Sequence, residues 1–339
     1  MLAEIRSGPP DRFILRRISH GGDSTRFAED VRAGLTATPK YLLPKYFYDE
    51  LGSQLFEAVC RLPEYYLMRA EREILSRNAD EIVASIEGPA RIIELGSGSA
   101  EKTRYLIEAM LRRQSELHYL PVDISDVSLE SSSLELLHIY PRLRITAFVA
   151  DYFSAIDALA KDSATRRGDA RTVVLFLGSN IGNFDPNESR VFLREVRRVL
   201  RAGDGLLMGA DLKKSARVLV PAYSDALGVT AAFNLNLLVR INRELDGDFN
   251  IENFKHRAVY NEELGRMEMY IVSRERQTAR MRAIDLEIQL ERGETIHTEN
   301  SYKFDLEQLA AFARDTDFAL EKTWFDGARY FSFNLFAAR

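Results

Sequence analysis

Cysteine is nearly absent from this chain, since Cys60 is the single cysteine among 339 residues. One cysteine cannot close an intramolecular disulfide, and it leaves no cysteine cluster that could hold a metal ion. The five histidines are scattered along the sequence without the spacing of metal ligands. We therefore expect no disulfide and no metal site.

Long apolar runs and an excess of positive charge are also lacking. No run approaches the roughly 20 apolar residues of a membrane-spanning helix, and the charged, proline-containing N-terminus has no apolar core like that of a signal peptide. The net charge of −5 argues against a broad nucleic-acid-binding face. We expect a cytoplasmic monomer that binds a small molecule rather than a membrane or a nucleic acid.

Helical and extended patterns alternate regularly between about residues 69 and 212. Amphipathic helical segments separate short apolar strands, which we expect at residues 92–95, 117–123, 144–149, 172–177 and 205–211. Strands separated by helices in this way form a parallel sheet with helices on both faces. The sequence therefore predicts a doubly wound α/β fold, in which ligands bind at the carboxyl ends of the strands.

A glycine turn, Gly96-Ser97-Gly98, follows the first of these strands. Glycine lets a ligand approach the main chain closely, and a helix that begins at about residue 100 would favour negative charge at its N-terminus. Glu94, the last-but-one residue of the strand, points towards the same crevice. We assign the three turn residues to a candidate cofactor site.

The turn lacks the third glycine of a dinucleotide-binding fingerprint, because Glu101 stands at that position. An acid there is a poor neighbour for a pyrophosphate. The pattern E-x-G-x-G instead resembles the nucleoside-binding turn of S-adenosylmethionine-dependent methyltransferases, and the ammonium of Lys102 could meet a ligand carboxylate. The alternative is a plain strand–helix turn with a solvated lysine.

Polar side chains follow the next three strands. Asp123 ends the second strand, where an acid is placed to accept hydrogen bonds from ribose hydroxyls. Asp151 and Tyr152 follow the third strand and could offer a carboxylate and a ring to adenine, although Asp151 could equally be a loop or cap residue. The loop after the fourth strand contains Asn183, whose amide can bind an amino-acid carboxylate or amine.

The alternation stops at about residue 213. A helical stretch over 213–240 is followed by antiparallel strands, expected at residues 256–261, 266–273, 283–289 and 294–298. Tyrosines crowd into residues 41–70, where core packing and pocket lining are both open readings. We divide the chain into an α/β domain (61–212 and 303–339) and a smaller α+β substrate domain (1–60 and 213–302).

Seven motifs, in order along residues 46–304, together resemble one family. They are YFYDELGSQLF, LPEYY, ELGSGSAEKT, FLGSNIGNF, AYSDALGVTAAFN, RMEMY and TENSYKF. The set is similar to the L-histidine Nα-methyltransferases of ergothioneine biosynthesis. The resemblance implies a Rossmann-like class I methyltransferase domain and the transfer of three methyl groups from S-adenosylmethionine to the α-amino group of histidine, giving hercynine.

The resemblance also implies roles for individual residues. For the cofactor, it assigns the methionyl part to Gly96 and Lys102, the ribose to Asp123, and the adenine to Asp151 and Tyr152. For histidine, it assigns the carboxylate to Asn183 and Tyr223, the imidazole to Glu299 and Ser301, a packing contact to Met269, and the amine end to Tyr65 and Tyr48. A tyrosine hydroxyl or a water chain would carry the proton, so Tyr48 and Tyr65 are the catalytic candidates.

The chain departs from the pattern expected of the family at Asn180 and at Asn300. Because Asn300 lies between the two residues assigned to the imidazole, a methyltransferase acting on another amino acid or small amine is the main alternative. A non-enzymatic nucleoside-binding protein is a second alternative, although it would need neither the Asn183 loop nor the Glu299 and Ser301 pair. An NAD-dependent oxidoreductase is disfavoured by Glu101.

Overall fold

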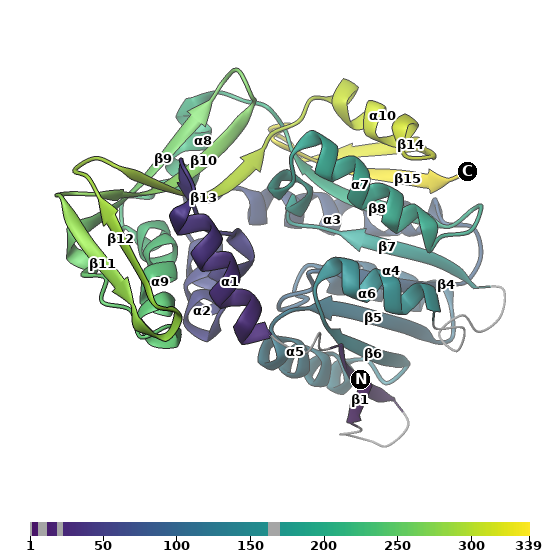
Figure 1. Cartoon of the computed structure of the whole chain (residues 1–339). Coiled ribbons are helices and arrows are strands. Elements are labelled where there is room, and N and C mark those ends of the chain that lie inside the picture. Colours follow the sequence, from purple (N-terminus) through teal and green to yellow (C-terminus); the bar gives the residue numbers. More distant parts are fainter. Residues whose placement is uncertain (1, 6–11, 19–22, 162–169) are drawn as a thin grey trace. The chain divides into compact units, whose positions relative to one another are not determined.

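The computed structural model describes residues 2–5, 12–18, 23–161 and 170–339 (Figure 1). The chain divides into two compact units, each assembled from segments that are distant in the sequence. The first unit comprises Met1–Ser19, Leu67–Lys213 and Phe304–Arg339, and the second comprises His20–Tyr66 and Lys214–Lys303. Parts of the predicted domains, residues 1, 6–11, 19–22 and 162–169, lie outside the described residues.

A nine-stranded sheet forms the centre of the first unit. Its order is β1 (Leu2–Ile5), β2 (Phe13–Ile18), β6 (Leu143–Val149), β5 (Leu117–Asp123), β4 (Ala90–Leu95), β7 (Arg171–Phe176), β8 (Gly205–Asp211), β15 (Phe331–Ala338) and β14 (Phe318–Phe325). The strands from β2 to β8 run parallel, whereas β15 is antiparallel to both β8 and β14. The chain reverses its direction of winding between β4 and β7, where a doubly wound sheet opens its ligand crevice. This arrangement confirms the predicted Rossmann-like class I fold.

Helices cover both faces of this sheet. They are α3 (Leu67–Ala84), α4 (Thr103–Arg113), α5 (Asp126–Ile139), α6 (Tyr152–Lys161), α7 (Pro186–Arg198) and α10 (Leu306–Asp315). α3 packs beside α4, and both α6 and α10 pack beside α7. Figure 1 shows α6 and α7 in front of the strands and α3 behind them. β4 and β8 are buried at every residue, because helices shield both faces of the sheet.

The second unit combines helices with two small sheets, which are antiparallel except where β3 pairs in parallel with β13. A four-stranded sheet has the order β3 (Lys40–Tyr41), β13 (Thr295–Tyr302), β10 (Arg266–Ser273) and β9 (Phe254–Asn261), and a hairpin pairs β11 (Gln277–Met281) with β12 (Leu286–Leu290). The helices are α1 (Asp23–Thr36), α2 (Glu50–Cys60), α8 (Ala216–Tyr223) and α9 (Val229–Glu244), with short 3₁₀ turns η1 (Pro44–Phe47), η4 (Ile251–Asn253) and η5 (Arg282–Ile284). α9 packs on α2 and on β9.

Two expectations about chain organisation are wrong. The N-terminal segment was expected in the smaller domain, but β2 pairs in parallel with β6 and buries Phe13 and Leu15 in the first unit. The strand expected at 283–289 begins only at Leu286, because η5 and the positive φ of Asp285 (45°) form the turn of the β11–β12 hairpin. Of the described helices, none is both long and apolar enough to cross a membrane.

Candidate functional site

The turn after β4 requires glycine at Gly96 and leaves space at Gly98. Gly96 has a φ of +77°, and a Cβ there would lie 2.8 Å from the Tyr152 hydroxyl and 3.0 Å from Asn180 Nδ2. Gly98 has a φ of +50°, but a Cβ there would meet no atom within 4 Å. The backbone is therefore held in a conformation that favours glycine beside open space, which a ligand could enter.

Ser97 and Asp123 add polar groups to this space. The Ser97 hydroxyl is buried and has no hydrogen-bond partner among the residues that the structure describes. Asp123 accepts from the Gly98 N–H (2.8 Å, Oδ2) and the Ser125 N–H (2.9 Å, Oδ1), which ties the glycine turn to the end of β5. Burial raises the pKa of Asp123. Because a carboxylate has about four acceptor sites, Asp123 keeps capacity for ribose hydroxyls.

Tyr152 and Asp151 stand at the start of α6. The Tyr152 ring packs edge-on against Phe176 of β7, with centroids 5.4 Å apart, and its hydroxyl lies beside the Gly96 turn. Asp151 is exposed and accepts from the Ser154 N–H (2.9 Å) and hydroxyl (2.6 Å). The structure thus gives Asp151 a capping role at this helix and places Tyr152 against the turn.

Lys102 is held by a buried acid that the sequence analysis missed. Its ammonium pairs with Glu71 of α3, which is fully buried, and the other Glu71 oxygen accepts from the Gly178 N–H (2.7 Å) after β7. Glu71 therefore links the turns that follow β4 and β7. An ammonium has three donors, so this pairing leaves Lys102 able to meet a ligand carboxylate.

Glu94 is a second buried acid beneath the turn. Both of its carboxylate oxygens accept from the Thr103 hydroxyl (2.7 and 2.8 Å), and one also accepts from the Tyr119 hydroxyl. Burial raises the pKa of Glu94 to about 7, although these hydrogen bonds oppose the shift. Glu94 joins β4, β5 and the start of α4 under the glycine turn.

The loop after β7 is fixed by Ser179 and ends at Asn183. Ser179 adopts a left-handed conformation (φ 58°), and its hydroxyl accepts from the Asp211 N–H (2.9 Å). The following 3₁₀ turn η3 (Asn180–Asn183) brings Asn180 beside the Gly96 turn and ends at the half-buried Asn183. Of the residues predicted to bind substrate, Asn183 belongs to the first unit.

The other predicted substrate residues gather in the second unit. The hydroxyls of Tyr223, on α8, and Ser301, on β13, lie 2.8 Å apart. Met269 on β10 faces Glu299 on β13 as its cross-strand partner. Since alternate residues of a strand share a face, Glu299 and Ser301 lie on the same side of β13. Burial raises the pKa of Glu299 to about 7, and the nearby charge of Lys303 opposes the shift.

Asn300 lies on the opposite side of the strand. Its side-chain oxygen lies 2.9 Å from Nε2 of His297. The departure from the family pattern at this position therefore does not alter the face that carries Glu299 and Ser301.

A chain of aromatic rings leads to Tyr223. The Tyr65 ring meets those of Tyr223 (centroids 6.5 Å apart) and Phe56 (6.2 Å), and Phe56 also meets Tyr48 (5.5 Å). Burial raises the pKa of Tyr65 well above its ordinary value, and the negative charges that Tyr223, Tyr48 and Glu299 carry when they ionise would add to the shift. Tyr65 is therefore a neutral phenol at physiological pH.

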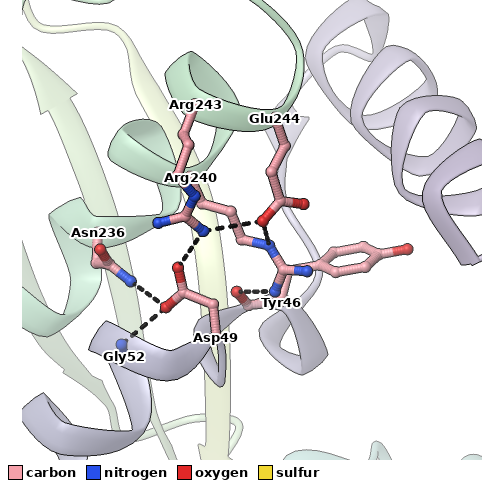
Figure 2. Close-up of polar contacts among 7 residues, drawn as sticks. All are labelled: Tyr46, Asp49, Gly52, Asn236, Arg240, Arg243 and Glu244. Atoms are coloured by element: carbon pink, nitrogen blue, oxygen red, sulfur yellow. Dashed lines mark hydrogen bonds and ion pairs between the residues drawn. The ribbon is translucent and has the colours of Figure 1, made fainter.

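Asp49, which directly follows Tyr48 in the sequence, links the start of α2 to side chains of α9 (Figure 2). It caps α2 by accepting from the Gly52 N–H (2.7 Å), and it also accepts from Asn236 (2.7 Å) and Arg243 (2.6 Å) of α9. Burial acts to raise the pKa of Asp49, but the hydrogen bonds from these three groups outweigh burial and hold it below its ordinary value. Sequence spacing gave no sign of the links to α9, because Asn236 and Arg243 lie 187 and 194 residues from Asp49.

The described residues contain no group of three or more His, Cys, Asp or Glu side chains arranged for a metal ion.

The side chains described above form two sets, one within each unit. The first surrounds the glycine turn and fits a nucleoside ligand, because it combines open space, buried acceptors and a hydroxyl that no described residue pairs with. The second combines a carboxylate, two hydroxyls and aromatic rings, which suits a small polar molecule with a ring nitrogen.

Comparisons with known proteins point in the same direction. A family described as histidine-specific, S-adenosylmethionine-dependent methyltransferases matches residues 27–338. The chain is 41% identical to the histidine N-alpha-methyltransferase of Mycolicibacterium smegmatis, over 90% of this chain and 93% of that protein. It is 39% identical to the protein of the same name from Mycobacterium tuberculosis, over 91% and 94%. It is also 30% identical to ergothioneine biosynthesis protein 1 of Schizosaccharomyces pombe, over 66% of this chain and 30% of that protein.

Proposed function

Because this chain belongs to the family of histidine-specific, S-adenosylmethionine-dependent methyltransferases, we propose that it trimethylates the α-amino group of L-histidine to hercynine, a step of ergothioneine biosynthesis. The observation that carries the proposal is the side of β13 on which Glu299 and Ser301 lie together, beside Met269 and Tyr223. A carboxylate and a hydroxyl two residues apart can bind the two nitrogens of one imidazole.

The first unit would hold the methyl donor. Gly96, Ser97 and Gly98 form the turn against which it lies, and Asp123, Asp151 and Tyr152 are the candidates for its ribose and adenine. Lys102 would bind the methionyl carboxylate while it keeps its pairing with Glu71. When bound, S-adenosylmethionine supplies a methyl group that its sulfonium has already activated.

The second unit would orient the amino acid through Tyr223, a proposed carboxylate partner, and the other proposed carboxylate partner is Asn183 of the first unit. Positioning of a nucleophile can account for roughly 7–11 kcal/mol of a barrier. The amine must be neutral at every attack, and free histidine carries mostly an ammonium at neutral pH, so one proton must leave before the first transfer and one more after each of the first two transfers. We assign its departure to the hydroxyls of Tyr65 and Tyr48. Because the pKa of Tyr65 is raised, Tyr65 would relay the proton rather than store it as a phenolate.

Tyrosine rings would also favour the product. Trimethylation leaves a fixed positive charge on nitrogen, and such a cation is attracted to the face of an aromatic ring. Tyr48 and Tyr65 belong to a connected set of rings in the second unit. This set could stabilise the positive charge without forming a hydrogen bond, which a quaternary nitrogen cannot donate.

Mass spectrometry of histidine incubated with the enzyme and methyl donor tests the proposal. We expect a gain of three methyl groups, and the same assay run across the twenty amino acids tests whether another amine is the substrate. Methyl transfer to a different amino acid, with histidine unchanged, would contradict the proposal.

Glu299→Ala provides the matched test of the imidazole site. We expect it to weaken histidine binding by about 1–3 kcal/mol, because a buried hydrogen-bond partner is lost, and to relax selectivity towards apolar side chains. Calorimetric titration measures the affinity, and Glu294→Ala, which removes an acid paired with Lys40 (2.6 Å) near the start of the same strand, is the control. Unchanged histidine affinity in Glu299→Ala would remove Glu299 from the site.

A further inference from the structure

Lys303 is a buried cation to which none of the roles above has been assigned. It follows β13 directly and is 1% exposed. Its Nζ lies 2.7 Å from the Tyr223 hydroxyl and 2.8 Å from the Ser301 hydroxyl, and 4.7 Å from the centre of the Tyr223 ring. Burying an ammonium costs several kcal/mol before its interactions are counted, so an apolar residue would fill this position at lower cost.

The chemistry of the three groups determines which way their hydrogen bonds run. An ammonium donates and never accepts, so the oxygens of both Tyr223 and Ser301 accept from Lys303. The two oxygens are 2.8 Å apart, so one hydroxyl donates to the other. Two hydroxyl protons are present and only one is used within the cluster. The remaining proton must be donated to a group outside it.

We propose that Lys303 is a positioning residue that fixes the Tyr223–Ser301 pair as a hydrogen-bond donor towards the substrate ring. The inference rests on the proposed function, since it concerns the imidazole of histidine. When Tyr223 donates to Ser301, the Ser301 oxygen accepts from both Lys303 and Tyr223. The Tyr223 hydroxyl then has no hydrogen left for the histidine carboxylate, which Asn183 alone would bind. The Ser301 proton then points to the ligand, where it needs a ring nitrogen that carries no hydrogen.

The consequence is selection of one protonation state of the ring. Glu299 accepts an N–H from one ring nitrogen, and a carboxylate alone would favour the doubly protonated, charged ring. With Ser301 held as a donor, the second nitrogen must be bare, so the site takes the neutral imidazole. The other titratable groups around the pair are Tyr65, whose ring meets that of Tyr223, and His256, whose Nε2–H donates to the Tyr223 carbonyl (2.7 Å).

Nitrogen-15 NMR of labelled histidine bound to the unmodified enzyme at neutral pH tests the inference directly. We expect one protonated and one bare ring nitrogen in the bound state. Two protonated nitrogens would overturn the inference and leave the proposed function standing. If calorimetry shows no histidine binding, the proposed function fails, and this inference fails with it.

Substitution of the lysine provides the second test. Lys303→Met keeps most of the apolar stem but removes the donor, and we expect histidine affinity to fall about tenfold or more and the bound ring to become doubly protonated. In a Ser301→Ala background, the factor by which Lys303→Met lowers histidine affinity should be at least about five times smaller. The reason is that the residue through which Lys303 acts is already absent. Equal losses in both backgrounds would show a merely structural role and overturn the inference.

Lys214→Met is the matched control. Lys214 donates to the Tyr66 hydroxyl (2.9 Å) and lies 4.7 Å from the Tyr66 ring centre, so it repeats the lysine–tyrosine geometry with a different tyrosine. We expect Lys214→Met to leave both the histidine affinity and the ring state unchanged. Should Lys303→Met fail to fold, the NMR measurement on the unmodified enzyme still decides the question.

Discussion

Glu94 illustrates at the scale of one residue how burial makes stability depend on pH. Its pKa is raised to about 7 in the folded chain, chiefly by burial, from an ordinary value of 4.5. The folded state therefore holds a proton between these values that the unfolded state has released. The resulting stability is fully present below about pH 4.5 and is lost as the pH rises through 7.

We expect Glu94→Gln to flatten this dependence. The raised pKa changes the free energy of unfolding by on the order of 3 kcal/mol over the full titration. Between about pH 5 and 8, the free energy of unfolding of the variant should therefore change by most of this amount less than that of the unmodified protein. Urea unfolding at a series of pH values measures it, with Glu87→Gln at an exposed position as the control. An unaltered slope in the Glu94 variant would show that other groups set the pH dependence.

Asp123 allows the cofactor assignment to be tested separately from the substrate assignment. We expect Asp123→Ala to weaken the binding of S-adenosylhomocysteine by about 1–3 kcal/mol, because a buried acceptor that also holds the Gly98 N–H is lost. Calorimetry measures this, and Asp126→Ala, which removes a surface pair with Arg17 (2.8 Å), should have no such effect. If histidine binding alone suffered, Asp123 would not be a cofactor residue.

The sequence predicts the roles of some single residues better than those of others. Asp123 is predictable, because an acid that ends a strand after a glycine turn has a known place in an α/β fold. Glu71 gives a weaker signal: it is an acid on the apolar face of a helix, near Leu67, Ile74 and Leu75 in helical spacing. The sequence gives no signal for the role of Lys303, because its contact with Tyr223 joins residues 80 positions apart.

At the scale of elements, Asp49 shows how one cap can join two helices. We expect Asp49→Ala to lower the free energy of unfolding by about 2–3 kcal/mol, since it removes a helix cap and strips a buried acceptor from Asn236 and Arg243. Urea unfolding measures the change. Tyr48 precedes Asp49 directly, so the variant should also shift the ring that we place at the amine end.

Asp305→Ala is the control for this prediction. Asp305 caps α10 through a capping box, but it is exposed, so its loss should cost only about 1 kcal/mol. If the two variants were equally destabilised, the links from Asp49 to α9 would contribute nothing.

Elements were predictable where the apolar pattern was strong. The expected strands 117–123, 205–211 and 266–273 have the bounds found for β5, β8 and β10. α1 was missed because its apolar positions, Phe27, Val31 and Leu35, recur every four residues within an otherwise polar segment. β11 reads QTARM, where alternate polar residues give a two-stranded hairpin little apolar signal.

At the scale of the whole molecule, the N-terminal segment is a part of the large sheet. We expect removal of residues 1–18 to destabilise the first unit by about 3–5 kcal/mol, because Phe13 and Leu15 are almost fully buried and β6 would become an edge strand. Urea unfolding of this truncation can be compared with removal of residues 1–11, which keeps β2. Identical midpoints for the two would show that β2 contributes nothing to stability.

The connectivity of the second unit has a consequence for synthesis on the ribosome. Its first segment ends at Tyr66, and the second begins only at Lys214. The nascent chain therefore exposes α1 and α2 long before α9 and β13 exist to cover them. Phe47, for example, stacks on Phe233 with ring centroids 4.6 Å apart. Such apolar side chains stay uncovered until more than half of the polypeptide has been synthesised, and chaperones would be needed during this interval.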